Sequence, residues 1–209
     1  MNHLRREISQ EPPDLECIAW DIHILSALAL IANICLPLIG AGALAVCVDT
    51  LSFIVSRSWE AESRTLAARC VTNAAVHLEE ALEDLDGTTL VLEALRMDLL
   101  PTLLKCEPLL PFADNKKARQ EPGKLLCAII SNYTIYRSVL RDVIPLIEEA
   151  EESGLVRKLK KGGSMEADWL KLKEKVDERR ELLKQASPLA IQNCHNERVR
   201  DQRKPGAPC

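Results

Sequence analysis

An uncharged run near the N-terminus most constrains what this chain of 209 residues can fold into. From Ile24 to Val48 the sequence reads ILSALALIANICLPLIGAGALAVCV, 25 residues without one charge, whereas 28% of the whole chain is charged. A straight helix of that length would reach about 37 Å, enough to cross a hydrocarbon core of about 30 Å. The run must therefore lie inside a protein core or enter a membrane.

Pro37, Gly40 and Gly42 interrupt this run. Pro37 removes a backbone donor and disfavours helix at Leu36, so the uninterrupted part, 22–36, would span only about 22 Å. That length is short for a transmembrane span. We expect the run to form the apolar centre of a helical bundle, and insertion into a bilayer on demand remains the alternative. The insertion segment would carry Ile24, Leu28, Ile31, Leu36 and Pro37.

The composition favours an all-α protein. Aromatic residues make up only 3% of the chain, and Leu, Ala, Glu, Lys and Arg dominate, which suits helices better than strands. The 31 acidic and 27 basic residues are mixed along the chain, and the net charge is -4. No global positive field would recruit nucleic acid, so we expect no nucleic-acid partner.

Cysteine usage and the N-terminal residues indicate the compartment. The eight cysteines are scattered, and several sit in apolar periodic segments, where a reduced cysteine behaves as a small hydrophobe. About twenty mostly polar residues precede the uncharged run, which is unlike a cleaved secretory signal. We therefore expect a cytoplasmic protein, with peripheral or conditional insertion at membranes as the alternative.

The N-terminal half is predicted to contain two long helices. Residues 1–14 are expected to be a disordered lead, with Asp14 as the N-cap of a first helix over 15–36. After the Pro-Gly break, a very long second helix is predicted over 43–85, because apolar side chains keep helical spacing almost to Gly87.

The C-terminal half is predicted to contain a broken segment and two helices. A short helix over 89–100 precedes a proline-rich loop or insertion at about 101–123. The spacing of apolar residues predicts a helix over 124–152, and Ser164 begins the final one. The tail, 196–209, lacks apolar periodicity and is expected to be disordered.

Four apolar-faced helices within 15–195 make a four-helix bundle the simplest architecture. The side chains expected to share its core recur at spacings of three and four residues along the predicted helices. They are Leu66, Leu78, Leu82, Tyr133, Leu140, Trp169, Leu172 and Val176.

The order of these segments resembles a known group of helical domains. The Pro-Gly break LPLIGAGAL is followed by RSWEAESRTLAARCVTN, and the patch GLVRKLKKGG precedes MEADWLKLKEKVDERRELLKQASPLAI. Over about Ile24 to Ile191 this is similar to N-terminal domains of mushroom-forming fungi, to fungal HeLo domains and to the N-terminal bundle of the mixed lineage kinase domain-like pseudokinase. The N-terminal four-helix bundle of the Cbl adaptors has the same broad shape.

The resemblance implies a non-enzymatic signalling or adaptor module that acts through protein contacts and self-association, in receptor-linked or cell-death signalling. The alternative that it implies is a membrane-inserting cell-death effector that uses the apolar segment 24–55. In such families the bundle usually precedes a kinase, NTPase or other effector domain.

The sequence contains no complete motif for bond chemistry. Gly40-Ala41-Gly42 lacks the remaining glycine, the lysine and the preceding strand of a phosphate loop, and is better interpreted as a turn between helices. The four histidines are far apart with no regular spacing to cysteines, and no G-x-S-x-G or H-E-x-x-H motif occurs. We expect no catalytic residue, metal site, cofactor or small-molecule substrate.

A basic cluster near the C-terminus has two interpretations. Arg157, Lys158, Lys160 and Lys161 are interleaved with Leu155 and Leu159. The cluster could contact anionic lipid headgroups while the leucines dip into the interface. Alternatively, the leucines pack against the bundle and the cations keep an exposed loop solvated.

Overall fold

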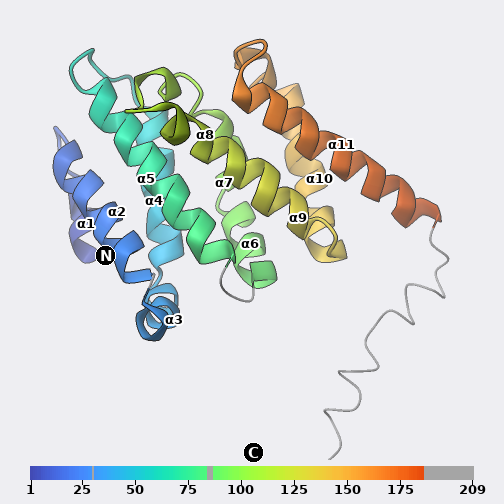
Figure 1. The fold of residues 1–209 in the computed structure, drawn as a ribbon, viewed down its shortest axis with the longest axis horizontal. Helices are drawn as coiled ribbons and strands as arrows, with labels where there is room; N and C mark the ends of the chain where they lie inside the picture. The colour runs from blue at the N-terminus through green and yellow to red at the C-terminus, as the bar shows by residue number, and fades with distance from the viewer. Residues whose placement is uncertain (30, 84–86, 186–209) are drawn as a thin grey trace, which may run out of the picture.

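A computed structural model describes residues 1–29, 31–83 and 87–185. Helices and turns make up this described part, which contains no strand, so the predicted all-α class is confirmed (Figure 1). The helices, in chain order, are α1 (Asn2–Glu7), α2 (Leu15–Ala29), α3 (Ala32–Gly40), α4 (Ala43–Ser56), α5 (Arg64–Glu83), α6 (Gly87–Arg96), α7 (Leu99–Leu104), α8 (Lys116–Lys124), α9 (Ser131–Tyr133), α10 (Arg137–Glu152) and α11 (Ser164–Gln185).

The helices form two layers, and the chain alternates between them (Figure 1). The front layer holds α2, α5, α8 with α9, and α11, while α1, α4, α6 with α7, and α10 lie behind. Neighbours within each layer are in contact, as are α4 with α5 and α10 with α11. The apolar core therefore extends along the interface between the layers, with α1 and α2 at one end and α10 and α11 at the other.

The prediction that residues 1–14 are disordered is wrong for Asn2–Glu7, which form α1. Leu4 of α1 is fully buried, and Met1 and Ile8 pack against the same core, so this short segment has enough apolar surface to dock. The predicted cap of α2 is confirmed, because Oδ1 of Asp14 accepts a hydrogen bond from the backbone N–H of Cys17 at 3.0 Å.

The predicted first helix, 15–36, is two helices. The chain is extended at Ile31 (φ -91°, ψ 105°), between α2 and α3. Pro37, the expected breakpoint, lies inside α3, since its missing N–H removes only one hydrogen bond from that helix. The Gly40-Ala41-Gly42 turn is confirmed: Gly42 has a φ of 90°, which glycine adopts at no steric cost.

The predicted second helix, 43–85, is interrupted between α4 and α5. Arg57 is extended, and the indole Nε1 of Trp59 donates to the Ile54 carbonyl at 2.8 Å, which caps the end of α4. The guanidinium Nε of Arg64 donates to the Trp59 carbonyl at 3.1 Å. Apolar periodicity continues across this turn because both helices bury side chains in the same core.

The segment 101–123, expected to be a loop, contains α7, a 3₁₀ turn (Leu110–Phe112) and α8. Pro101 occupies the third position of α7, where a backbone N–H has no partner within the helix, so proline fits. The side chain of Asn115 caps α8 by accepting from the N–H of Ala118 at 2.9 Å. This segment is an integral part of the array, because α8 contacts both α5 and α11.

The predicted helix over 124–152 is also divided. A π-helical turn (Leu125–Ile130) joins α8 to α9, and α10 begins only at Arg137. Arg179 of α11 donates to the Ser131 carbonyl and to the hydroxyl of Thr134, which satisfies polar groups at the break. Such side-chain contacts from a distant helix could not be predicted from local spacing.

The final helix begins at Ser164 as predicted. Most of the expected core side chains are buried, namely Leu78, Leu82, Leu140, Trp169, Leu172 and Val176. Leu66 and Tyr133 are half-buried and pack against that core. Gly123 allows α8 and α11 to approach closely, because a Cβ there would collide with the Asp168 carboxylate. The predicted tail, 196–209, lies outside the described residues.

Candidate functional site

A ridge of exposed side chains on α2 is the main candidate for a functional surface. It consists of Trp20, His23, Ile24 and Ala27, which share one helical face and are called the α2 ridge below. Trp20 is 65% exposed and Ile24 is 50% exposed. The Trp20 and His23 rings meet edge to face, with their centroids 5.9 Å apart.

The exposure of this ridge follows from the composition of α2. The helix is apolar on nearly every face, but it can bury only the sides that meet other helices. Ile18, Ile22 and Leu25 are buried, whereas Trp20 and Ile24 point outward. The sequence signal for this surface is the spacing of four residues between Trp20 and Ile24, which places both side chains on one face of a helix.

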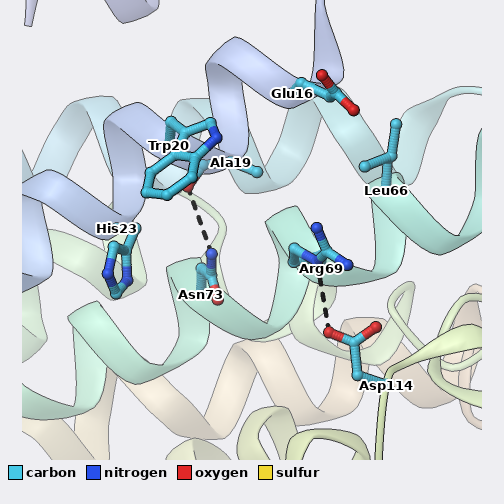
Figure 2. Close-up of a pocket in the computed structure, with 8 residues that line it drawn as sticks. All are labelled: Glu16, Ala19, Trp20, His23, Leu66, Arg69, Asn73 and Asp114. Carbon is cyan, nitrogen blue, oxygen red and sulfur yellow. Dashed lines mark hydrogen bonds and ion pairs between the residues drawn. The ribbon is translucent and has the colours of Figure 1, made fainter.

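A groove runs between α2 and α5 beside the ridge. Its larger hollow, of about 350 Å³, is lined by Glu16, Ala19, Trp20, His23, Leu66, Arg69, Asn73 and Asp114 (Figure 2). An adjoining hollow of about 220 Å³ shares His23 and Asn73 and extends to Ala27 and Val76. Together these hollows are called the α2–α5 groove.

Hydrogen bonds and an ion pair hold the walls of the groove. The side-chain amide of Asn73 donates to the Ala19 carbonyl at 3.4 Å, which ties α5 to α2 (Figure 2). Nε of Arg69 donates to Oδ2 of Asp114 at 3.3 Å, but both side chains are about half exposed, so this pair contributes little stability. The Asn73 amide and the Arg69–Asp114 pair are thus already partnered, and Glu16 and His23 line the groove beside the apolar side chains of Ala19, Trp20 and Leu66.

A second hollow lies on the other side of the ridge. It measures about 220 Å³ and is formed by α1, α2 and α3, with Leu4, Ile24, Leu28 and Leu38 among its lining residues. Nδ1 of His3 lies 2.7 Å from Oδ2 of Asp21 at its edge. The α2 ridge therefore stands between two concave surfaces, a shape that can interdigitate with another protein surface.

The basic cluster lies on the turn between α10 and α11. Arg157, Lys158, Lys160 and Lys161 are exposed there. Leu159 is buried and Leu155 is half-buried against the core, as in the interpretation in which these leucines pack against the bundle. Packing against the bundle removes the apolar surface that an interfacial contact needs.

The hypothetical insertion segment is only partly exposed. Ile24, Ile31 and Pro37 are exposed and Leu28 is half-buried, whereas the side chain of Leu36 lies outside the described part. Figure 1 places α3 at the lower edge of the molecule and the turn before α11 at the upper edge of its other end. The fold therefore does not bring the insertion segment and the basic cluster together.

Neither a membrane-spanning helix nor a metal-binding cluster occurs among the described residues. Across the described residues, no helix is both long enough and apolar enough to span a bilayer. The same residues contain no group of three or more His, Cys, Asp or Glu side chains placed to hold a metal ion. The four cysteines whose side chains are described are free thiols, and burial raises the pKa of Cys47 and of Cys70 to about 12.

His77 of α5 is a buried titratable residue that the sequence did not reveal. Neither ring nitrogen has a hydrogen-bond partner among the residues described. Burial lowers the pKa of His77 to about 4, so its imidazole is neutral at pH 7. Its position three residues after Ala74 and one before Leu78, both buried, is the sequence signal that would have placed it on the core face of α5.

A carboxylate pair bridges α5 and α8. Glu121 is buried, and Nζ of Lys124 donates to both of its carboxylate oxygens, at 2.9 and 3.1 Å. Burial and the nearby charge of Glu121 raise the pKa of Glu79. This cluster opens into none of the hollows described above, so we assign it to the packing of the two helices.

Comparisons of the chain with family models, with curated proteins and with solved structures found no match.

Proposed function

We propose that this protein is a non-enzymatic interaction module that acts by binding other proteins through the α2 ridge. The observation that carries the proposal is the exposure of Trp20 and Ile24 on one helical face between two hollows. Large aromatic side chains beside concave surfaces are typical anchors of protein interfaces. Signalling or adaptor activity, in receptor-linked or cell-death pathways, is the role that the sequence resemblance favours for such a module.

The two ends of the helical array support this proposal. End helices of stacked arrays normally carry a polar outer surface, which keeps them soluble. The exposed surface of α11 mixes the charged Glu174, Asp177 and Glu178 with Leu170 and Leu182, whereas the α2 ridge at the other end contains no Asp, Glu, Lys or Arg. The α2 ridge, which no charged side chain interrupts, is therefore the exposed surface that gains most from a partner.

A pair of matched variants tests the proposal. Trp20→Ala/Ile24→Ala removes the exposed ridge, and Ile135→Ala/Leu182→Ala removes side chains of similar exposure, 66% and 57%, near the other end. We expect quantitative mass spectrometry of co-purified proteins to show at least one partner lost from the first variant and retained by the second. An identical set of partners for both variants and the wild type would contradict the proposal.

A membrane-active effector is the second candidate, and the exposure of Ile24, Ile31 and Pro37 in an uncharged segment favours it. In this candidate, the apolar segment 24–55 separates from the array and enters a bilayer, and the protein self-associates. Arg157, Lys158, Lys160 and Lys161 would contact anionic headgroups only after such a rearrangement.

Flotation with vesicles that contain anionic lipid separates the two candidates. The interaction module is expected to stay at the bottom of the gradient, because no more than a few ridge side chains can reach the bilayer while α2 stays packed. Flotation that disappears when Arg157, Lys158, Lys160 and Lys161 are all replaced by Gln would instead support the membrane effector. Release of an entrapped dye would extend that result from binding to insertion.

A further inference from the structure

A hollow that the proposed function does not use lies beside the start of α10 and the end of α11, at the end of the array opposite α2 (Figure 1). It measures about 360 Å³, which is within the range of small-molecule sites. It is called the α10–α11 hollow below. Its lining residues are Thr134, Ile135, Arg137, Leu140, Arg179, Leu182 and Leu183.

Four of these side chains are apolar. Leu140 is buried and Leu183 is half-buried, whereas Ile135 is 66% exposed and Leu182 is 57% exposed. Ile135 precedes α10 and Leu182 belongs to α11, so an occupant of the hollow can remove apolar surface of both from water. This part of the hollow suits a hydrocarbon chain.

The polar side chains of the hollow offer hydrogen-bond donors but no free acceptor. Nη1 of Arg179 donates to the Ser131 carbonyl and to the Thr134 hydroxyl, which holds the guanidinium in place and leaves its other nitrogens without a partner among the described residues. The Thr134 hydroxyl in turn donates to the Ser131 carbonyl at 2.6 Å, so it is already engaged in both roles. A ligand here must therefore supply the acceptors itself.

The charge of the hollow is positive. Two of its lining residues are arginines and none is acidic. Arg137 is exposed and pairs with no described carboxylate, whereas Arg141, one turn further along α10, lies 3.4 Å from the Asp142 carboxylate. Arg137 is also the first residue of α10, whose N-cap Tyr136 makes no side-chain hydrogen bond, so the helix dipole adds to the positive potential. The hollow therefore favours an anion beside its apolar surface.

We infer that the α10–α11 hollow binds a single-chain carboxylate of the fatty-acid class, with the carboxylate at Arg137 and Arg179 and the hydrocarbon chain on the four apolar side chains. A carboxylate carries acceptors only, which matches donor-only arginines. An extended peptide fits less well, because its backbone N–H groups need acceptors that these side chains do not supply. The ligand is bound without chemical change. This inference goes beyond the proposed function and does not depend on it, because the α2 ridge lies at the other end of the array.

Isothermal titration calorimetry of the full chain with dodecanoate, kept below its micelle-forming concentration, tests the site. We expect one dodecanoate per chain, with a Kd on the order of 100 µM for a small ligand in an open hollow. Dodecyltrimethylammonium has the same chain and the opposite charge, and should bind about tenfold more weakly or less. No binding of dodecanoate, or equal binding of the two ligands, would overturn the inference. Binding of anionic vesicles without binding of monomeric dodecanoate would also overturn it, in favour of a membrane surface as the occupant.

Matched variants locate the site. Arg137→Gln is expected to raise the Kd for dodecanoate about fivefold or more, because it removes a charged donor. Leu182→Ala should raise it about threefold or more through lost apolar contact. Arg141→Gln, on the same helix, and Leu170→Ala, which is also 57% exposed on α11, should leave the Kd unchanged. All four side chains are exposed, so the fold should persist, and circular dichroism checks this. A Kd that is the same in Arg137→Gln as in Arg141→Gln would overturn the inference.

A dodecanoate analogue with a diazirine near the end of its chain tests the position of the ligand without any substitution. Cross-links are expected within 134–140 and 179–183, the two segments that line the hollow. Cross-links confined to α2 and α5, or a Kd for dodecanoate that rises in Trp20→Ala/Ile24→Ala, would place the ligand at the α2 ridge and overturn the inference. Loss of a protein partner from that ridge variant with unchanged dodecanoate binding would support the two sites independently.

Discussion

Replacing Trp169 with alanine is expected to lower the free energy of unfolding by about 3 to 5 kcal/mol, the range for truncating a large buried aromatic side chain. Trp169 is only 1% exposed and belongs to the largest fully buried side chains of the protein. It lies on α11, which packs against α8, the π-helical turn and α10. The alanine variant therefore leaves a cavity where the last helical pair meets the rest of the array.

Urea denaturation followed by circular dichroism measures this change. Leu170, the next residue, is 57% exposed, so Leu170→Ala should change the free energy of unfolding by no more than about 0.5 kcal/mol. A Trp169→Ala variant as stable as Leu170→Ala would mean that α11 does not pack through its predicted seam.

Acidification is expected to destabilise the fold through His77. The pKa of this buried imidazole is lowered to about 4, below its ordinary value of 6.5. The unfolded chain therefore binds a proton between these two values that the folded chain does not bind. Stability is full above pH 6.5, falls as the pH drops toward 4, and should be lower by about 2 kcal/mol at pH 5 from this group alone.

The variant His77→Leu isolates this contribution. Leucine fills a similar volume without a titratable group, so the variant should lose about 2 kcal/mol less than the wild type between pH 7 and pH 5. The exposed His3 and His23 are common to both proteins and cancel in the comparison. Parallel plots of stability against pH for the two proteins would show that His77 is not buried.

Helix starts were predictable where a local signal marks them. Asp14 caps α2, and Ser164 begins α11, because short polar side chains before an apolar pattern stabilise a helix start. The ends of α2 and α4 could not be predicted. The chain leaves α2 at Ile31, where no glycine or proline marks the break. The end of α4 is capped by the side chain of Trp59, which local sequence rules do not identify as a capping group. The break between α9 and α10 could not be predicted either, because the Arg179 side chain that contacts it comes from α11, far away in the sequence.

The candidate site was less predictable than the fold class. Apolar spacing marks residues that can be buried, but Trp20 and Ile24 show that packing partners decide which of them are. Because α2 is apolar on most faces, the positions of α1 and α5 determine which face stays exposed. In the basic cluster the charged side chains are exposed, whereas Leu159, which lies between them in the sequence, is buried in the core.

The binding affinity of one purified partner, measured for the wild type and for Trp20→Ala/Ile24→Ala, tests most directly whether the α2 ridge is the functional surface. The partner is first identified by co-purification, and the affinity is then measured by isothermal titration calorimetry. Loss of the ridge is expected to raise the Kd about tenfold or more, while Ile135→Ala/Leu182→Ala leaves it unchanged. Equal Kd values for the ridge variant and the wild type would contradict a functional role for this surface.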